Sequence, residues 1–291
     1  MSEVLDEAEW TRRRDRHDKR VTAILGPYLA QRGHGTPDPV IDFLFTYYTM
    51  RPAQLSRWHP GVGVGLSGPS AHAYQRLSGY CRVGGAVTVD PDLLSRRRDT
   101  IDFIVGLLDA TAGRTPSFGC FGLHEWAMVY RAAPGEARHR AVPLRLGTAG
   151  TDAVVEALPL RCTHFDAFRF FTAAARPRNG TQLTRELQPA TEQPGCLHAA
   201  MDLYKWGVKL LPLLDSDTLM DAFELAYAAR VLDMRASPYD LRGHGYEPIC
   251  IETPSGRAEY VRQQAVIAGR SAVVRQELLT RCRGLIEAAV Q

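Results

Sequence analysis

The chain has 291 residues, of which 45% are hydrophobic and 23% charged, and its formal net charge is +3. These values are typical of a globular protein with a sizeable core, and the near-neutral charge gives no basic field that would attract nucleic acid. The six cysteines include no CxxC pair, which argues against a zinc ribbon, an iron–sulfur site or a disulfide framework. The N-terminus lacks the apolar run of a signal peptide and no stretch is long enough to span a membrane, so we expect a cytoplasmic protein without a membrane partner.

The hydrophobic pattern predicts a mainly α-helical protein. Residues 5–32 are expected to form an amphipathic helix whose RRRDRHDKR run faces water. A short apolar helix, VIDFLFTYYTM, follows and ends before Arg51-Pro52. Residues 59–90 are rich in Gly and Pro and contain AVTV, so they are predicted to form an insertion of loops and short strands.

Residues 92–291 are predicted to be the helical core of a single globular domain that spans residues 1–291. Ser216 and Ser255 are expected to open two of its helices, and residues 176–195 to be an irregular connection facing water or a pocket mouth. VPLRLG is a candidate strand. The core helices are expected at residues 92–112, 119–131, 162–173, 196–211, 216–232 and 256–289.

Three apolar and aromatic segments carry ionisable side chains: FGCFGLHEWAMVYR, RCTHFDAFRFF and GCLHAAMDLYKW. Burying an unpaired charge is costly, so such groups pair, titrate together or bind a ligand. The segments therefore predict that their polar groups converge on one internal site, which favours an enzyme or a metal centre over a passive module. The groups are His124 and Glu125, His164 and Asp166, and His198 and Asp202.

The spacing of these groups allows a metal site. His198 and Asp202 are four residues apart on a predicted helix and so share one face. His164 and Asp166 would share a face only on a strand or turn. Imidazole and carboxylate donors suit iron, manganese or zinc. The ligands would be His124, His164 and His198 with Asp202 or Asp166. The alternative is that the histidines are hydrogen-bonded core residues.

Three basic side chains lie among aromatic or apolar neighbours. Lys205, in DLYKW, is one of only three lysines in the chain, and it is either a desolvated amine or anion clamp, or a side chain that reaches outward to water. Arg169 and Arg235 are expected to pair with neighbouring carboxylates or to bind a substrate phosphate.

The run HPGVGVGLSG resembles the hairpin of helix-hairpin-helix DNA-binding proteins, in which glycines let backbone N–H groups approach a phosphate. The alternative is an ordinary Gly-rich loop. The same run does not match a dinucleotide-binding fingerprint, because no strand precedes it and no helix follows.

Five segments together resemble a family of actinobacterial proteins commonly labelled 3-methyladenine DNA glycosylase: RPAQLSRWHPG, FGCFGLHEWAMVYR, THFDAFRFFT, EQPGCLHAAMDLYKW and LDMRASPYDL. The similarity spans residues 10–270. It implies hydrolysis of the N-glycosidic bond of a damaged purine in DNA, after base flipping and without a cofactor. The catalytic candidates under this resemblance are Asp166 or Asp202 as the assisting carboxylate, with Glu125 and Lys205. The substrate-binding candidates are Trp126, Phe165, Tyr204, Arg169 and Arg235.

Residue chemistry alone favours a second function, a metal-dependent enzyme of the non-haem iron type that acts on a small molecule. Glu125 and Asp166 would lie in or beside the ligand set, and Lys205 or Arg235 would hold an anionic group of the substrate. A third class is a non-catalytic protein that binds a small ligand.

Overall fold

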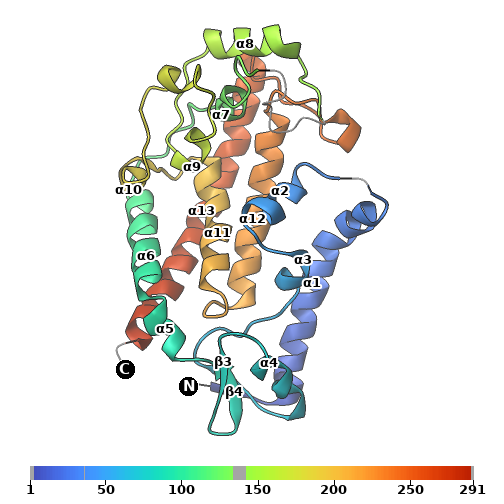
Figure 1. Ribbon diagram of the computed structural model, residues 1–291, viewed down its shortest axis with the longest axis vertical. Coiled ribbons are helices and arrows are strands. Elements are labelled where there is room, and N and C mark those ends of the chain that lie inside the picture. Colours follow the sequence, from blue (N-terminus) through green and yellow to red (C-terminus); the bar gives the residue numbers. More distant parts are fainter. Residues whose placement is uncertain (1–2, 36, 134–141, 290–291) are drawn as a thin grey trace. The chain divides into compact units, whose positions relative to one another are not determined.

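The computed structural model describes residues 3–35, 37–133 and 142–289, and it is mainly α-helical, as the sequence predicts (Figure 1). None of the helices in these three ranges combines the length and apolar character needed to cross a membrane. The α-helices are α1 (Glu7–Gly33), α2 (Ile41–Tyr47), α3 (Pro52–Leu55), α4 (His72–Gln75), α5 (Asp92–Arg96), α6 (Arg98–Ala112), α7 (Leu123–Ala127), α8 (Gly147–Ala157), α9 (Phe165–Phe168), α10 (Gln188–Thr191), α11 (Leu197–Leu210), α12 (Ser216–Arg235) and α13 (Pro254–Ala288).

The chain divides into two compact units. Unit 1 consists of residues 1–106, 203–224 and 274–291, and unit 2 consists of residues 107–202 and 225–273. Four helices, α6, α11, α12 and α13, each contribute one part to unit 1 and the other to unit 2. That the whole chain forms a single domain stays a prediction.

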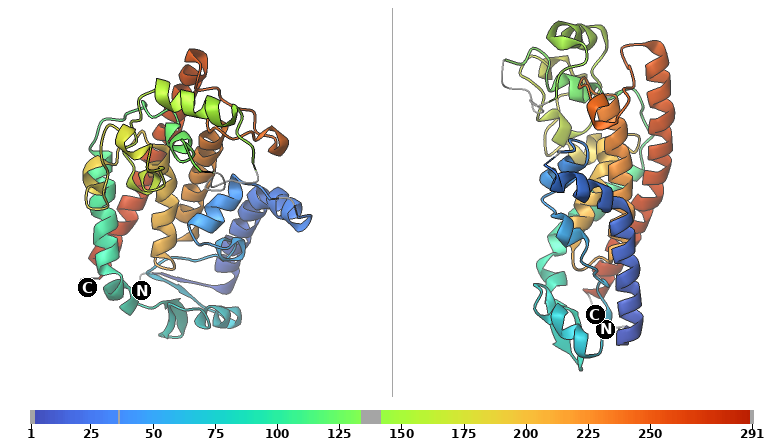
Figure 2. Two further views of the ribbon diagram at one scale, coloured as in Figure 1. Left: turned by 45° about the horizontal axis from the view of Figure 1, so that its top comes forward. Right: turned by 90° about the vertical axis from the view of Figure 1, so that its right-hand side faces the viewer.

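Unit 1 contains the predicted short-strand insertion. Its sheet has the strand order β1-β2-β4-β3, in which β1 runs parallel to β2 and the other pairs are antiparallel. Gly84 and Gly85 form the hairpin turn between β3 and β4 with φ angles of 57° and 90°, a region that favours glycine. Figure 2 shows this hairpin near the N-terminal end of α1. The strands are β1 (Glu3–Leu5), β2 (Val64–Leu66), β3 (Tyr80–Val83) and β4 (Ala86–Val89).

Helix α1 confirms the predicted N-terminal amphipathic helix. Asp6 caps its first turn by accepting a hydrogen bond from the Glu9 N–H at 2.8 Å. Trp10 and Leu25 lie on its buried face. The charged run is largely exposed, with the exception of His17, whose imidazole is buried.

The helices predicted at 119–131 and 162–173 are wrong in extent, since α7 and α9 are single short turns. Phe121 and Gly122 have φ angles of 51° and 75°, and this left-handed backbone prevents a helix from starting before Leu123. His164 is extended, so α9 cannot begin earlier. VPLRLG contributes an isolated bridge between Leu144 and Tyr239 instead of a strand.

Helix α12 starts at Ser216, as predicted, and α13 starts two residues before the predicted position, but the residues that cap both helices differ from those expected. The cap of α12 is Asp215, whose carboxylate accepts a hydrogen bond from the Thr218 N–H at 2.9 Å, while Ser216 is the first helical residue. The cap of α13 is Thr253, whose hydroxyl accepts from the Gly256 N–H at 3.0 Å. A side chain one or two residues before the predicted position satisfies the free N–H groups in both helices.

Gly256 in the first turn of α13 tests how tightly unit 2 is packed. A Cβ atom at this position would lie 2.0 Å from the carbonyl oxygen of Cys250, which is backbone and cannot move aside cheaply. We expect Gly256→Ala to lower the free energy of unfolding by about 3 kcal/mol. Gly269 lies in the same helix with open space around it, so Gly269→Ala should be neutral or stabilise by up to about 1 kcal/mol. Chemical denaturation measures both, and equal stability of the two variants would contradict the packing described.

Candidate metal centre

Two imidazoles and a carboxylate converge in unit 2 to form the first cluster. His124 lies on α7, His198 on the first turn of α11 and Asp233 near the end of α12. One ligand atom from each residue lies within 4.8 Å of the others. His124 Nε2 is 2.8 Å from Asp233 Oδ1, and all three side chains are at most 7% exposed.

Neighbouring groups orient the first cluster. Cys120 Sγ lies 3.4 Å from His124 Nδ1, which leaves Nε2 directed at Asp233. Arg230 Nη1 donates to Asp233 Oδ2 at 2.9 Å and to Glu125 Oε1 at 2.7 Å. Outer contacts of this kind fix the rings and carboxylates of metal sites.

The charge balance around the first cluster favours a cation. Burial opposes a charge on His124, but Asp233 and Cys120 outweigh it and raise the pKa of the imidazole well above its ordinary value. Burial also opposes the charge on Arg230, and Glu125 and Asp233 nevertheless raise its pKa. The surroundings of His124 and Asp233 therefore stabilise a positive charge on this pair, whether it is a proton or a metal ion.

The second cluster, also in unit 2, consists of His164, Glu192 and Asp202, which again place one ligand atom each within 4.8 Å of one another. His164 Nε2 lies 3.3 Å from Asp202 Oδ2 and 3.5 Å from Glu192 Oε2. All three side chains are at most 1% exposed. Gln188 Nε2 donates to Glu192 Oε2 at 3.0 Å and thus orients this carboxylate.

The two clusters are adjacent through their histidines. The ring centroid of His198 lies 4.5 Å from that of His124 and 5.3 Å from that of His164. His198 and Asp202, from different clusters, are one turn apart on α11, as their sequence spacing predicts. The structure thus brings the three histidines and Asp202 near one another, but it divides them between two ligand sets where the sequence predicted one.

The donors are of the hard nitrogen and oxygen type. Two cysteines of unit 2, the buried Cys162 and the partly exposed Cys196, stay neutral thiols near neutral pH because removal of the thiol from water raises the pKa of each. All six cysteines are free, as expected. The clusters thus suit iron, manganese or zinc better than a soft metal bound by thiolates.

Tyr260, on α13 in unit 2, is fully buried, and its hydroxyl has no hydrogen-bond partner among the described residues. Burial, followed by the charges of Asp233 and Cys120, raises the pKa of this hydroxyl well above its ordinary value. A neutral hydroxyl of this kind is a donor available to a bound ligand.

Asp166 lies in neither cluster. Its carboxylate Oδ1 is 2.7 Å from Arg185 Nη2 and 3.4 Å from Arg169 Nε, so the predicted pairing of Arg169 with a neighbouring carboxylate is present. The guanidinium of Arg185 also lies 4.8 Å from the ring centroid of Phe165. Asp166 and Glu125 are thus both buried carboxylates held by arginine.

Four other predicted site residues make contacts outside the clusters. Trp126 is buried and donates its indole N–H to the Ala236 carbonyl at 2.8 Å. Arg235 donates to the Glu247 carbonyl at 2.9 Å. Tyr204 and Lys205 belong to unit 1. The Tyr204 ring packs against Tyr48 and Phe223, and the Lys205 ammonium lies 4.4 Å from the ring centroid of Trp206.

Sequence reasoning missed Glu192 and Asp233. Glu192 follows α10 within the connection that was expected to face water or a pocket mouth, although its side chain is 1% exposed. Asp233 follows Arg230 by three residues in the apolar stretch AYAARVLDM of α12. A pair of opposite charges at this spacing inside an apolar helix was the available signal for Asp233.

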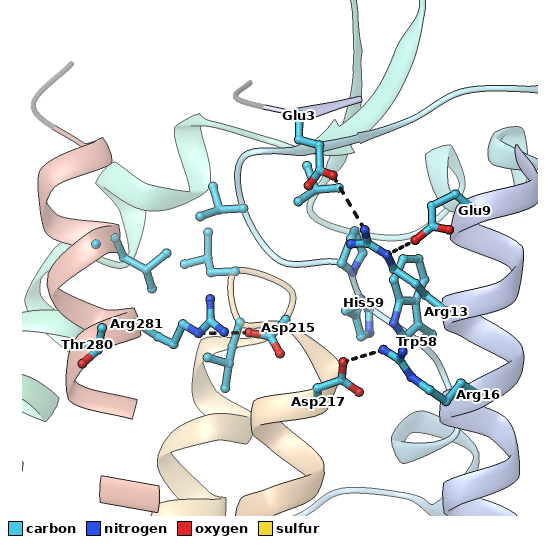
Figure 3. Close-up of a pocket in the computed structure, with 17 residues that line it drawn as sticks. Glu3, Glu9, Arg13, Arg16, Trp58, His59, Asp215, Asp217, Thr280 and Arg281 are labelled. Atoms are coloured by element: carbon cyan, nitrogen blue, oxygen red, sulfur yellow. Dashed lines mark hydrogen bonds and ion pairs between the residues drawn. The ribbon is translucent and has the colours of Figure 1, made fainter. Parts of the chain in front are cut away.

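Unit 1 contains a cavity of about 640 Å³ with a partly apolar lining (Figure 3). The arginines drawn there face acidic partners, so no unbalanced charge points to a ligand. The pairs are Arg13 with Glu3 and Glu9, Arg16 with Asp217, and Arg281 with Asp215.

The HPGVGVGLSG run lies beside this cavity and forms a structural turn. The Val62 N–H donates to the Leu213 carbonyl at 2.9 Å, and the His59 N–H donates to the Ser216 hydroxyl at 2.8 Å. Strand β2 follows where the second helix of a helix-hairpin-helix motif would lie. The ordinary loop interpretation therefore holds for this run.

Comparisons of the chain with protein-family models, with curated proteins and with solved structures gave no significant match. The actinobacterial family resemblance accordingly stays a prediction, and the geometry of the two clusters is the basis for the proposed function.

Proposed function

We propose that this protein is a metal-dependent enzyme of the non-haem iron type, with its metal ion held by His124, His198 and Asp233. The observation that carries the proposal is the convergence of two imidazoles and one carboxylate within 4.8 Å in a buried setting. Three protein ligands of this type leave coordination positions open for a substrate or oxygen, as in non-haem iron enzymes.

The distances support this assignment. Ligand atoms about 2.1 Å from a common ion lie about 3.0 Å apart in octahedral geometry and about 3.4 Å apart in tetrahedral geometry. The separation of 2.8 Å between His124 Nε2 and Asp233 Oδ1 is close to the octahedral value and is also that of an ordinary hydrogen bond, so the two atoms can exchange a shared proton for an ion. Arg230 donates a hydrogen bond to the other carboxylate oxygen of Asp233, Oδ2, so Oδ1 is the oxygen that would bind the ion.

Metal analysis tests the proposal. Protein purified without chelators is expected to carry near-stoichiometric iron, manganese or zinc, and His124→Ala and His198→Ala should lose it. His72, an exposed histidine of unit 1, supplies the matched control, since His72→Ala should retain the metal. Circular dichroism shows whether each variant is folded. Wild-type protein that stays metal-free after reconstitution would rule out the centre.

A catalytic ion must also have an open position, whereas a structural ion has none. Azide added to the ferric protein should produce a new charge-transfer absorption band if such a position exists. An iron-loaded protein that does not respond to azide would point to a structural ion and so contradict the enzymatic part of the proposal.

The glycosylase function implied by the family resemblance makes a different prediction. Incubation with methylated DNA should release free base, and Asp166→Asn and Asp202→Asn should abolish the release. DNA binding that is weak and insensitive to salt would argue against it, because phosphate neutralisation gives a steep salt dependence. We favour the metal-dependent enzyme, because Asp202 lies in a His and carboxylate cluster and Asp166 is held by two arginines.

A further inference from the structure

The distances within the second cluster fit a metal site of its own. His164 Nε2 lies 3.3 Å and 3.5 Å from its two carboxylate oxygens, which is longer than a usual N–H···O hydrogen bond. Both distances agree with the separation of about 3.4 Å between ligand atoms around a tetrahedral ion. The three side chains thus have the spacing of groups arranged around a common centre.

The surroundings hold these three ligands in place. Glu192 ends α10, where its main-chain carbonyl accepts a hydrogen bond from Arg114 Nη1 at 2.9 Å. Its carboxylate accepts from Gln188, which in turn accepts a hydrogen bond from Arg185. Asp202 lies in the middle of α11, so the helix holds its backbone in place. Hydrogen-bonded outer groups of this kind are expected around metal ligands.

The two clusters bring several buried carboxylates close together. The clusters contain the carboxylates of Asp233, Glu192 and Asp202, and Arg230 is shared between Asp233 and the further carboxylate Glu125. Buried carboxylates require compensation by nearby positive charge. Two divalent ions, one in each cluster, would supply such charge.

We infer that the two clusters hold two transition-metal ions in one dinuclear centre, with the second ion on His164, Glu192 and Asp202. The inference rests on the proposed metal site at His124, His198 and Asp233. The row of three imidazoles, with centroid separations of 4.5 and 5.3 Å, places the two ligand sets side by side. Two-metal sites hold their ions about 3.5–4 Å apart, so that both ions contact the same reacting group.

Titration of chelator-treated protein with Mn²⁺ tests the inference. We expect two ions per wild-type chain and one ion in the double variant Glu192→Gln, Asp202→Asn, which removes two ligand charges while preserving side-chain shape. Glu186→Gln is the matched control, because Glu186 is an exposed carboxylate of the same connection, and it should still bind two ions. Thermal denaturation shows whether the double variant is folded, and if it is not, Glu192→Gln alone replaces it.

Electron paramagnetic resonance of the fully loaded wild-type protein gives a second readout that needs no variant. Two adjacent Mn²⁺ ions should give a magnetically coupled spectrum, and the double variant should give that of an isolated ion. One ion per wild-type chain, or two uncoupled ions, would overturn the inference and leave the proposed function intact. A double variant that binds two ions would also overturn it. Wild-type protein that binds none would overturn both.

Discussion

Replacing Arg230 with methionine is expected to lower the free energy of unfolding by about 3–5 kcal/mol, because it removes the buried cation that two buried carboxylates share. Arg230 is 1% exposed, and one of its nitrogens contacts both Glu125 and Asp233. Methionine fills similar space but carries no charge. The corresponding fall in melting temperature should be on the order of 10 °C.

Arg12 supplies the control, because its side chain is 74% exposed and pairs with Glu9 at the surface. Arg12→Met should change stability by no more than about 0.5 kcal/mol. Adding Glu125→Gln to Arg230→Met should recover about 1–2 kcal/mol, since it removes one of the two buried negative charges that Arg230 contacts. Equal melting temperatures for Arg230→Met and Arg12→Met would contradict the structural role assigned to Arg230.

Acidification between about pH 6.5 and pH 4 should destabilise the protein through His59. Burial, with help from Arg57 and His17, lowers the pKa of His59 from 6.5 to about 4. Over this pH range, His59 therefore binds a proton in the unfolded chain but stays neutral in the folded protein. The stabilisation is fully present above pH 6.5 and is lost as the pH falls towards 4, and it amounts to about 3 kcal/mol.

Replacement of His59 with asparagine removes the titrating group and should flatten this part of the stability profile. Asparagine keeps a polar group near the Tyr80 hydroxyl, which lies 2.8 Å from His59 Nδ1. Unfolding by urea at a series of pH values measures the difference between the variant and the wild type. Parallel stability profiles for the two proteins would show that another group controls the acid response.

The regular parts of the fold could be predicted from local pattern alone. Helix α1 and the short-strand insertion near residues 59–90 follow from periodicity and from Gly and Pro content. The short α7 could not be predicted, because FGCFGLHEWAMVYR has the composition of a helix and its left-handed backbone at Phe121 and Gly122 is imposed by packing. A Cβ atom on Gly122 would lie 3.2 Å from Ala236, a contact between distant parts of the chain.

The candidate site could be predicted in part for a similar reason. His198 and Asp202 are linked by helix periodicity, and ionisable groups inside apolar segments identified His124 and His164. Glu192 lies in a polar stretch where one more carboxylate is not informative. Its burial depends on tertiary contacts such as the hydrogen bond between Arg114 and its carbonyl. Local sequence therefore identified the ligands within the three aromatic segments and missed Glu192 and Asp233, which lie outside those segments.

The ligands of the two clusters come from parts of the chain that lie far apart, from residue 124 to residue 233. An ion bound to them acts as a cross-link that the unfolded chain lacks, so binding would add directly to folding stability. At a free ion concentration about 100 times the dissociation constant, the gain is about 2.7 kcal/mol. On the proposed function, a cell short of metal would hold a larger unfolded fraction of this protein. Proteases act on that fraction, so the amount of the protein would follow the supply of its ion.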